Sequence, residues 1–492
     1  TALKSLLLLQ VLLLPLQLIP TCTALSFSPQ LLERTIREKL ERITSGYKTH
    51  MDSMIRTLEM EIELSTKVEK CLLLSTATSS SRRHNDGIEQ QSSQHNSKLL
   101  SEKYLRKRSL MEECLNSNYH VVQQLLLGAT NDEMTRTNLL QRVTFAPSEG
   151  GGDDNGDDIT TLLGNGGMAN GGQSSTKETE GYDTAKQVIH HTARDWTLGS
   201  TPCRDATNGW IVNAITNNIR DVSVLRVLVP GAGLGRLAYD IYVLLEAGID
   251  VHVEANDSSV TMAFAAQSVL EMLKQRKQYR IHPFLSDPQR NEIDSTKRFE
   301  MELFPDDIAL ESYQNFNLLK GGNSLPNLSF TVGDFVSTYS RDTKRGQYDV
   351  IATSFFIDTA TNIYEYVVIM KHLLRTNESS IWVNCGPVQW HPCALLCPTV
   401  DELRDILEAS GFEVITWEIS KETVAYRHPD DGGDDVLQAA RYTRSEAYRP
   451  LRFVARLVVD SINPDDDVEV DLPLQIEYCE YLNEVANGGS QI

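Results

Sequence analysis

The chain has 492 residues, of which 41% are hydrophobic and 23% are charged, and its formal net charge is −21. This length and apolar content suffice to bury a sizeable core, and they correspond to roughly two domains. The acidic balance argues against nucleic acid or an anionic membrane as a partner, because a polyphosphate surface requires clustered lysines and arginines.

The eight cysteines are scattered along a long chain, a distribution that indicates reduced thiols and not a disulfide framework. Cys393 and Cys397 form a CxxxC pair without a second pair, whereas a structural zinc site uses four ligands. We therefore expect no metal.

Residues 1–24 contain a leucine-rich core, a single lysine and a small-residue end, which is the pattern of a signal peptide. The next five residues, LSFSP, loosely resemble the Phe-containing junction of plastid-targeting presequences. The sequence thus predicts a secretory or plastid-targeting leader, with a hydrophobic anchor or an incorrect gene start as the alternatives. No later stretch is long and apolar enough to span a bilayer.

Apolar residues recur at helical spacing between charged residues from residue 29 to about residue 127. This pattern predicts a helical N-terminal region over residues 29–145, more suited to a scaffold than to chemistry. The polar residues 76–97 are expected to form a disordered loop before a second helix over residues 98–127. Residues 146–181, rich in glycine and aspartate, are expected to be a linker or a surface insertion.

A helix ending in HTARDW precedes the most informative stretch of the chain, VLRVLVPGAGLGRLAYDIYVLLEAGIDVHVEAND. Its order is strand, glycine turn, helix, strand and acidic residue, which is the order of a nucleotide-binding βαβ unit. Glycines let the backbone approach a ligand at a helix N-terminus. The final carboxylate, that of Asp257, can accept hydrogen bonds from ribose hydroxyls. The GxGxG spacing lacks the third glycine of GxGxxG, which favours S-adenosylmethionine over NAD. A simple tight turn is the alternative.

Strand and helix signals then alternate to about residue 460. After a polar segment over residues 274–327, interpreted as an insertion, strands are expected over residues 328–335, 348–357, 381–387, 412–419 and 452–459. Alternation of this kind predicts a parallel sheet with right-handed crossovers. A last strand that folds back would add one antiparallel edge, which gives an α/β fold of the class I methyltransferase type, a Rossmann-like seven-stranded sheet. Residues 182–460 form this domain, and residues 461–492 an exposed acidic tail.

Polar residues follow five of these strands at the edge where ligands of open α/β sheets bind. They are Gly231 and Gly233, Asp257, Asp334 with Phe335, Ser354 to Asp358, and Asn384 to His391. Asp334 is suitably placed to bond an adenine amino group, with Phe335 flanking the ring. Asp257 is preferred to Glu254 as the ribose ligand because it ends its strand.

Six blocks of the chain, HTARDW, LVPGAGLGRLAYDI, EAND, GDF, SFFIDTATN and NCGPVQWH, resemble in order those of the carnosine N-methyltransferase family. The resemblance covers about residues 182–459, interrupted by residues 274–327. It implies transfer of a methyl group from S-adenosylmethionine to an imidazole nitrogen of carnosine (β-alanyl-histidine), which makes anserine.

The resemblance also implies the cofactor contacts. Arg194 should reach the methionine carboxylate, one turn after His191, where the family usually has Gln. The remaining implied cofactor positions are Gly231, Asp257 (Glu in the family), Asp334, Phe335 and Ser354 (often Cys).

Four further residues match the family's substrate-binding positions: Asp358, His391, Tyr426 and Tyr448. Asp358 and His391 are the candidate catalytic residues, since a carboxylate that accepts the distal imidazole N–H leaves the near nitrogen with a lone pair for an in-line displacement. The family departures at Thr361 (usually His) and at Trp390 and Pro392 bear on the acceptor and not on the reaction type.

Simpler roles remain open for each residue. Asp358 could cap the helix that begins near Asn362, His391 could be a satisfied loop histidine, and Arg194 could pair with a surface carboxylate. The two tyrosines, Tyr426 and Tyr448, could be packing residues.

The sequence therefore predicts an S-adenosylmethionine-dependent N-methyltransferase acting on carnosine or a related histidine dipeptide. A peptide or protein histidine methyltransferase, and a binding module without turnover, are the alternatives. An NAD oxidoreductase is disfavoured. The expected partner is a small dipeptide and not a nucleic acid, with a homodimer left open. The family resemblance suggests the cytosol or nucleus, in contrast to the leader.

Overall fold

The computed structural model describes ten stretches of the chain: residues 29–80, 89–128, 143–145, 184–219, 222–245, 249–285, 296–320, 325–376, 380–426 and 447–458. The leader, the linker over residues 146–181 and the acidic tail lie outside these described residues. Within them, no helix combines the length and the apolar content that a membrane span needs.

The core of the molecule is an eight-stranded sheet with the strand order β1-β6-β3-β2-β7-β8-β12-β9. Its strands are β1 (Val143–Phe145), β2 (Val224–Pro230), β3 (Asp250–Asp257), β6 (Leu328–Val332), β7 (Val350–Thr353), β8 (Ile381–Gly386), β9 (Phe412–Ile419) and β12 (Leu451–Leu457). All neighbours from β1 to β8 are parallel. Without β1, the sheet has the seven strands of the class I methyltransferase fold, which confirms the predicted fold class.

Two details of the sheet differ from the prediction. The antiparallel strand β12 lies between β8 and β9 and pairs with both, so it is not the edge strand that we expected. Periodicity identifies a strand but carries no information on which neighbour it joins, because pairing is decided by long-range packing. The short strand β1 adds a parallel edge beside β6, and a three-residue strand is too short to give a periodic signal.

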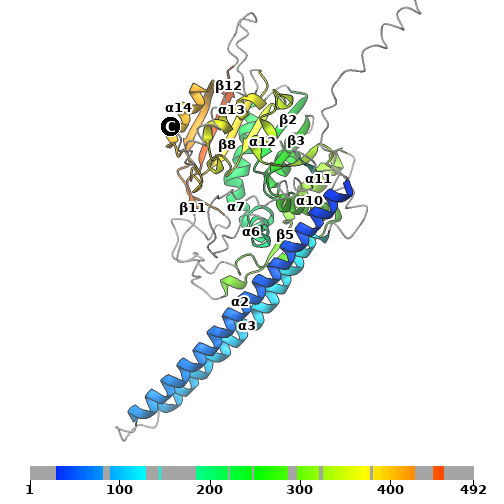
Figure 1. Ribbon diagram of the computed structural model, residues 1–492. Helices are drawn as coiled ribbons and strands as arrows, with labels where there is room; N and C mark the ends of the chain where they lie inside the picture. The colour runs from blue at the N-terminus through cyan, green and yellow to red at the C-terminus, as the bar shows by residue number, and fades with distance from the viewer. Residues whose placement is uncertain are drawn as a thin grey trace, which may run out of the picture.

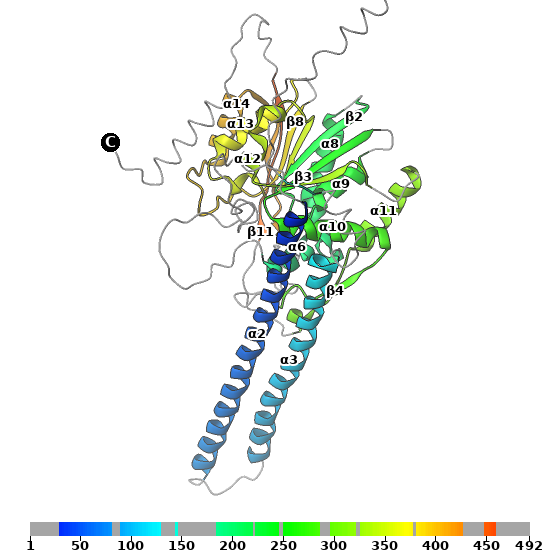
Figure 2. The same ribbon diagram turned by 45° about the vertical axis from the view of Figure 1, so that its right-hand side comes forward.

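Helices cover both faces of the sheet (Figures 1 and 2). On β2 the apolar side chains alternate: Val227 and Val229 pack in the core cluster that contains helices α8, α9 and α10, whereas Leu228 packs in the cluster that contains α12, α13 and α14. This alternation is what a strand buried on both faces requires. The six helices are α8 (Trp210–Asn218), α9 (Arg236–Leu244), α10 (Val260–Gln275), α12 (Phe335–Tyr339), α13 (Ile363–Leu373) and α14 (Val400–Ala409).

Two long helices, α2 (Pro29–Ser80) and α3 (Glu89–Leu126), lie side by side and project from the domain as a hairpin (Figures 1 and 2). At 1.5 Å per residue, α2 is about 78 Å long. The polar residues expected to form a loop are therefore partly helical, since residues 76–80 extend α2 and residues 89–97 begin α3. Helix propagation adds one hydrogen bond per residue once turns exist, so a polar stretch can prolong an established helix.

The base of this hairpin belongs to the core of the domain. Leu40 of α2 and Leu125 of α3 are fully buried in the same cluster as the residues of β2 and β3. The Ser268 hydroxyl of α10 donates to the Leu125 carbonyl at 2.7 Å. Asn118 and His282 exchange a reciprocal pair of hydrogen bonds, at 2.9 and 2.7 Å. The N-terminal helices are thus docked on the domain at one end.

The segment over residues 274–327, interpreted as an insertion, contributes to the same core. It contains an antiparallel pair, β4 (Tyr279–Ile281) and β5 (Glu302–Phe304), followed by helix α11 (Asp307–Lys320). Phe304 is fully buried and Asp306 is 1% exposed. The segment is polar overall, so its sequence pattern does not reveal these few buried residues.

A partly buried carboxylate, that of Glu254 in β3, bonds this strand to its neighbours. It accepts hydrogen bonds from the hydroxyls of Tyr348 (2.6 Å), Tyr339 (2.7 Å) and Thr331 (2.7 Å). Burial acts to raise the pKa of Glu254, but the Tyr348 hydroxyl, the Lys344 charge and the other two hydroxyls outweigh it and lower that pKa below its ordinary value.

We expect Glu254→Gln to lower the free energy of unfolding by about 2 kcal/mol at neutral pH, because hydrogen bonds to a charged acceptor are stronger than those to an amide. A lowered folded-state pKa stabilises the protein above the unfolded-state pKa, and this contribution disappears as the pH falls through the folded-state value. Urea unfolding should therefore show the difference shrinking on acidification. Glu408→Gln, on the exposed face of α14, should change stability by less than about 0.5 kcal/mol. An equal penalty at neutral and acid pH would contradict the assignment.

Candidate cofactor and substrate site

The glycine turn between β2 and α9 brings backbone close to neighbouring side chains. Gly231 and Gly233 have φ of 62° and 53°, in the left-handed region that favours glycine. A Cβ on Gly231 would lie 2.4 Å from a ring carbon of Phe356, and one on Gly233 would lie 3.4 Å from both Arg194 Nη2 and His191 Nδ1. The turn therefore depends on both glycines, and it faces the helix that carries Arg194.

Asp257, at the end of β3, holds this turn in place. Its Oδ2 accepts the Gly233 N–H at 2.8 Å, and its Oδ1 accepts the Ser259 N–H at 2.8 Å. The alternative acid, Glu254, points instead into the tyrosine cluster described above. The geometry thus places Asp257, and not Glu254, beside the glycine turn.

Helix α6 (Ala185–Trp196) delivers His191 and Arg194 to the turn. Thr184 caps the start of this helix by accepting the Gln187 N–H, and eight of its twelve residues are buried. The Arg194 guanidinium donates to both carboxylate oxygens of Asp195, at 2.6 and 3.1 Å, and to the Tyr426 hydroxyl at 2.8 Å. Arg194 therefore does pair with a carboxylate, but a largely buried one beside the glycine turn.

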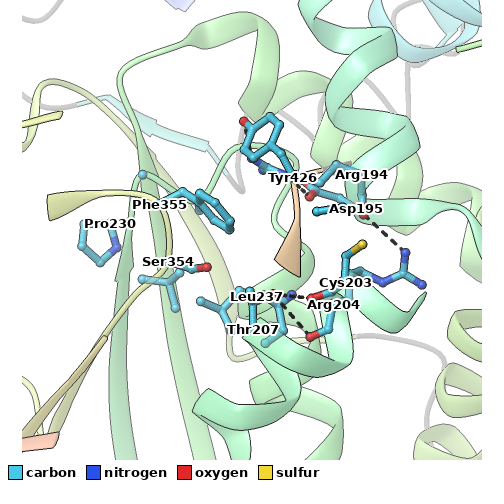
Figure 3. Close-up of a pocket in the computed structure, with 15 residues that line it drawn as sticks. Arg194, Asp195, Cys203, Arg204, Thr207, Pro230, Leu237, Ser354, Phe355 and Tyr426 are labelled. Atoms are coloured by element: carbon cyan, nitrogen blue, oxygen red, sulfur yellow. Dashed lines mark hydrogen bonds and ion pairs between the residues drawn. The ribbon is translucent and has the colours of Figure 1, made fainter. Parts of the chain in front are cut away.

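A pocket opens where β2 and β7 end, between the glycine turn, α6 and α7 (Thr201–Arg204) (Figure 3). Four of the predicted residues line it: Arg194, Gly231, Ser354 and Tyr426. The lining also includes residues that the sequence analysis did not single out, among them Asp195, Cys203, Arg204, Thr207, Asn208 and Phe355. Thr207 and Asn208 belong to a π-helical turn (Asp205–Gly209), a feature frequent at functional sites.

Aromatic rings form one wall of this pocket. The Arg194 guanidinium carbon lies 5.2 Å from the centre of the Tyr426 ring and 5.8 Å from that of Phe355, within cation–π range. Tyr426 lies 6.1 Å from Tyr448, ring centre to ring centre. The small antiparallel pair of β10 (Val424–Ala425) and β11 (Ala447–Tyr448) brings the two tyrosines together.

Phe355 has an unusual backbone conformation for a bulky residue, with φ of 52°. Such a conformation is strained and persists only when its surroundings enforce it. Gly386, at the end of β8, permits it, because a Cβ there would lie 2.7 Å from the Phe355 nitrogen. Residue 355 belongs to a predicted strand-end block but has no predicted role; the glycine in NCGP was the available signal.

Asp358 and His391 meet at the next strand end, although neither lines the pocket itself. The Gln389 N–H donates to Asp358 Oδ2 at 3.1 Å, and the His391 N–H donates to the Asp358 carbonyl at 3.1 Å. Asp358 is 5% exposed. Burial raises the pKa of its carboxyl, while the Gln389 N–H and the nearby His391 act in the opposite direction. Asn362 caps α13 with its own side chain, so Asp358 does not have the capping role considered above.

Asp334 and Phe335 lie on the far side of the turn. Asp334 caps α12 by accepting the Ser337 N–H and hydroxyl, both at 3.0 Å. Phe335 is 3% exposed and packs edge-on against Phe356, 5.3 Å away between ring centres. Because Phe356 is the ring that Gly231 approaches, Phe335 adjoins the turn through one intervening side chain.

Apart from Asp334 and Phe335, the predicted residues thus form three adjoining groups. Gly231, Gly233, Asp257, His191 and Arg194 surround the glycine turn, with Ser354 in the pocket beside it. Arg194 connects this group to Tyr426, which lies beside Tyr448. Two residues separate Phe355 from Asp358, which pairs with the His391 loop. Eight of the predicted residues lie outside the pocket lining: His191, Gly233, Asp257, Asp334, Phe335, Asp358, His391 and Tyr448.

Comparison with known proteins gives a consistent family assignment. A family model described as carnosine N-methyltransferase matches residues 172–431, which is more than half of the chain. The mouse protein of that name is 30% identical over 265 residues, covering 51% of this chain and 60% of the mouse protein. The Schizosaccharomyces pombe protein of the same name is 28% identical over 252 residues, covering 47% and 61%. The match therefore spans about three fifths of the length of these relatives.

Proposed function

The chain belongs to the carnosine N-methyltransferase family, and on that premise we propose that it transfers a methyl group from S-adenosylmethionine to an imidazole nitrogen of carnosine, giving anserine. The observation that carries the proposal is the buried Asp358 carboxyl beside the His391 loop, three residues after the pocket residue Phe355. A carboxylate at this place suits an acceptor that has one N–H to donate and one nitrogen lone pair to present.

The residues around the glycine turn fit S-adenosylmethionine. Gly231 and Gly233 have no side chain to separate the backbone of the turn from its surroundings, so that it lies close against Phe356, Arg194 and His191. The Arg194 guanidinium beside the turn suits the methionine carboxylate. Asp257, at the end of the second strand of the βαβ unit, suits the ribose hydroxyls. When bound, S-adenosylmethionine supplies an electrophilic methyl group.

The acceptor side depends on orientation more than on a strong base, because imidazole is largely neutral near pH 7. An ionised Asp358 accepts the distal N–H of the imidazole and so selects the tautomer whose near nitrogen carries the lone pair. It also stabilises the positive charge that grows on the ring. His391 orients the ring or the substrate carboxylate, and Tyr426 and Tyr448 bound the dipeptide. Holding both reactants in line supplies most of the acceleration.

Replacement of Asp358 by Asn tests the acceptor role. The amide can no longer stabilise the imidazolium charge, so we expect kcat/KM for carnosine to fall by about 100-fold or more. The dissociation constant of S-adenosylhomocysteine, measured by calorimetry, should change by less than about threefold, since Asp358 lies outside the glycine-turn group. The matched control is Asp405→Asn on the exposed face of α14, which should leave both values unchanged.

Methyl transfer would be followed with isotopically labelled S-adenosylmethionine and product detection by mass spectrometry. Cofactor binding without any methylated carnosine would contradict the proposed acceptor and direct the search to histidine in peptides or proteins. Full activity of the Asp358→Asn variant would contradict the role of this carboxylate.

Replacement of Gly231 by Ala tests whether the glycine turn binds the cofactor. The new methyl group would collide with Phe356, at 2.4 Å, and we expect the dissociation constant of S-adenosylhomocysteine to rise by at least about tenfold. Gly346→Ala is the matched control: its φ of 60° imposes similar backbone strain, but no atom lies within 4 Å of the added Cβ. Equal binding by the two variants would exclude the turn as the cofactor site.

A further inference from the structure

Two buried arginines outside the residues assigned so far converge on a single carboxylate oxygen. Arg204 Nη2 and Arg236 Nη1 donate to Asp306 Oδ2, at 2.6 and 2.9 Å. The side chains are 7%, 6% and 0% exposed, in that order. Asp306 lies in the segment over residues 274–327, whereas Arg204 ends α7 and Arg236 begins α9. One acidic side chain therefore joins three separate parts of the chain.

The same two arginines also hold the C-terminal end of α6. Arg204 Nη1 donates to the Thr197 carbonyl at 2.6 Å and to the Arg194 carbonyl at 3.3 Å. Arg236 Nη1 donates to the Asp195 carbonyl at 3.0 Å. The last carbonyls of a helix have no partner within the helix, and cationic side chains satisfy them well. The position of this helix end thus depends on where the two guanidiniums are held.

The side chains at that helix end lie against the glycine turn and the pocket beside it. Arg194 and Asp195 line the pocket, and a Cβ on Gly233 would lie 3.4 Å from Arg194 Nη2. Small movements of α6 along or across the turn would therefore change the distance between the Arg194 guanidinium and a ligand seated on the glycines.

The negative charge of Asp306 compensates the positive charges of the two buried arginines. Burial and the charge of Arg236 both lower the pKa of Arg204, and Asp306 opposes them. Burial also acts to lower the pKa of Arg236, but Asp240 and Asp306 together raise it. Without the Asp306 charge, two buried cations would remain side by side with less compensation, which is strongly unfavourable. The other oxygen, Oδ1, caps α11 by accepting the Ala309 N–H at 2.7 Å.

We propose that Asp306 is a positioning residue for the cofactor: through Arg204 and Arg236 it fixes the C-terminus of α6, and with it the Arg194 guanidinium, against the glycine turn. The proposal rests on S-adenosylmethionine binding as proposed above. It gives the segment over residues 274–327 a role at the amino-acid end of the cofactor, although no residue of that segment lines the pocket within the described part of the chain.

The test compares two ligands that differ at the amino-acid end. S-adenosylhomocysteine has a carboxylate for Arg194, whereas 5′-methylthioadenosine keeps the adenosine and lacks the amino acid. We expect Asp306→Asn to raise the dissociation constant of S-adenosylhomocysteine by about tenfold or more and that of 5′-methylthioadenosine by less than about threefold, measured by calorimetry. The matched control is Asp307→Asn, because Asp307 is the next residue, is exposed, and accepts a hydrogen bond from the Gln278 side chain at 3.0 Å.

Several outcomes would overturn the proposal. A purely structural role would weaken both ligands equally, or would lower the melting temperature without changing either affinity of the folded protein. If Asp306→Asn does not fold, Arg236→Lys provides the same comparison, since Arg236 does not line the pocket and lysine keeps the charge but loses the forked hydrogen bonds. Retained S-adenosylhomocysteine affinity in that variant would contradict the proposal. Failure of the unmodified protein to bind either ligand would instead contradict the proposed function.

Discussion

The close approach of α6 to the glycine turn is the contact on which the rest of the site depends. It is possible because Gly233 has no side chain, so that Arg194 and His191 can lie against its backbone. Asp257 secures the turn from one side through the Gly233 N–H. The arginines at residues 204 and 236 secure the helix end from the other. Asp306, in the segment over residues 274–327, in turn accepts hydrogen bonds from both arginines.

Much of the fold was predictable because its signals are local. An apolar strand, a glycine turn and an amphipathic helix predict the βαβ unit. The observed β2, α9 and β3 lie where these patterns place them. The features that could not be predicted depend on contacts between residues far apart in the sequence. The insertion of β12 between β8 and β9, and the burial of Asp306 among arginines more than 60 residues away, have no counterpart in local periodicity.

The site shows the same division between local and distant information. Gly231, Gly233 and Asp257 were predictable because strand ends of an open sheet share one edge. The contact of Arg194 with Tyr426, 232 residues apart, was not predicted. The family resemblance implied a cofactor role for the arginine and a substrate role for the tyrosine, and no spacing rule links them. Phe355 was overlooked because its importance lies in a strained φ that the sequence does not display. Local patterns thus predicted the surroundings of the glycine turn better than the aromatic wall.

We propose that the glycine turn holds the cofactor and presents its methyl group to an imidazole bound by Asp358. A crystal structure with S-adenosylhomocysteine and carnosine tests this most directly. We expect the homocysteine carboxylate beside Arg194 and the ribose hydroxyls at Asp257. One imidazole nitrogen should lie within hydrogen-bonding distance of the Asp358 carboxylate while the other faces the cofactor sulfur. An imidazole bound away from Asp358, or a cofactor seated away from the glycine turn, would contradict it.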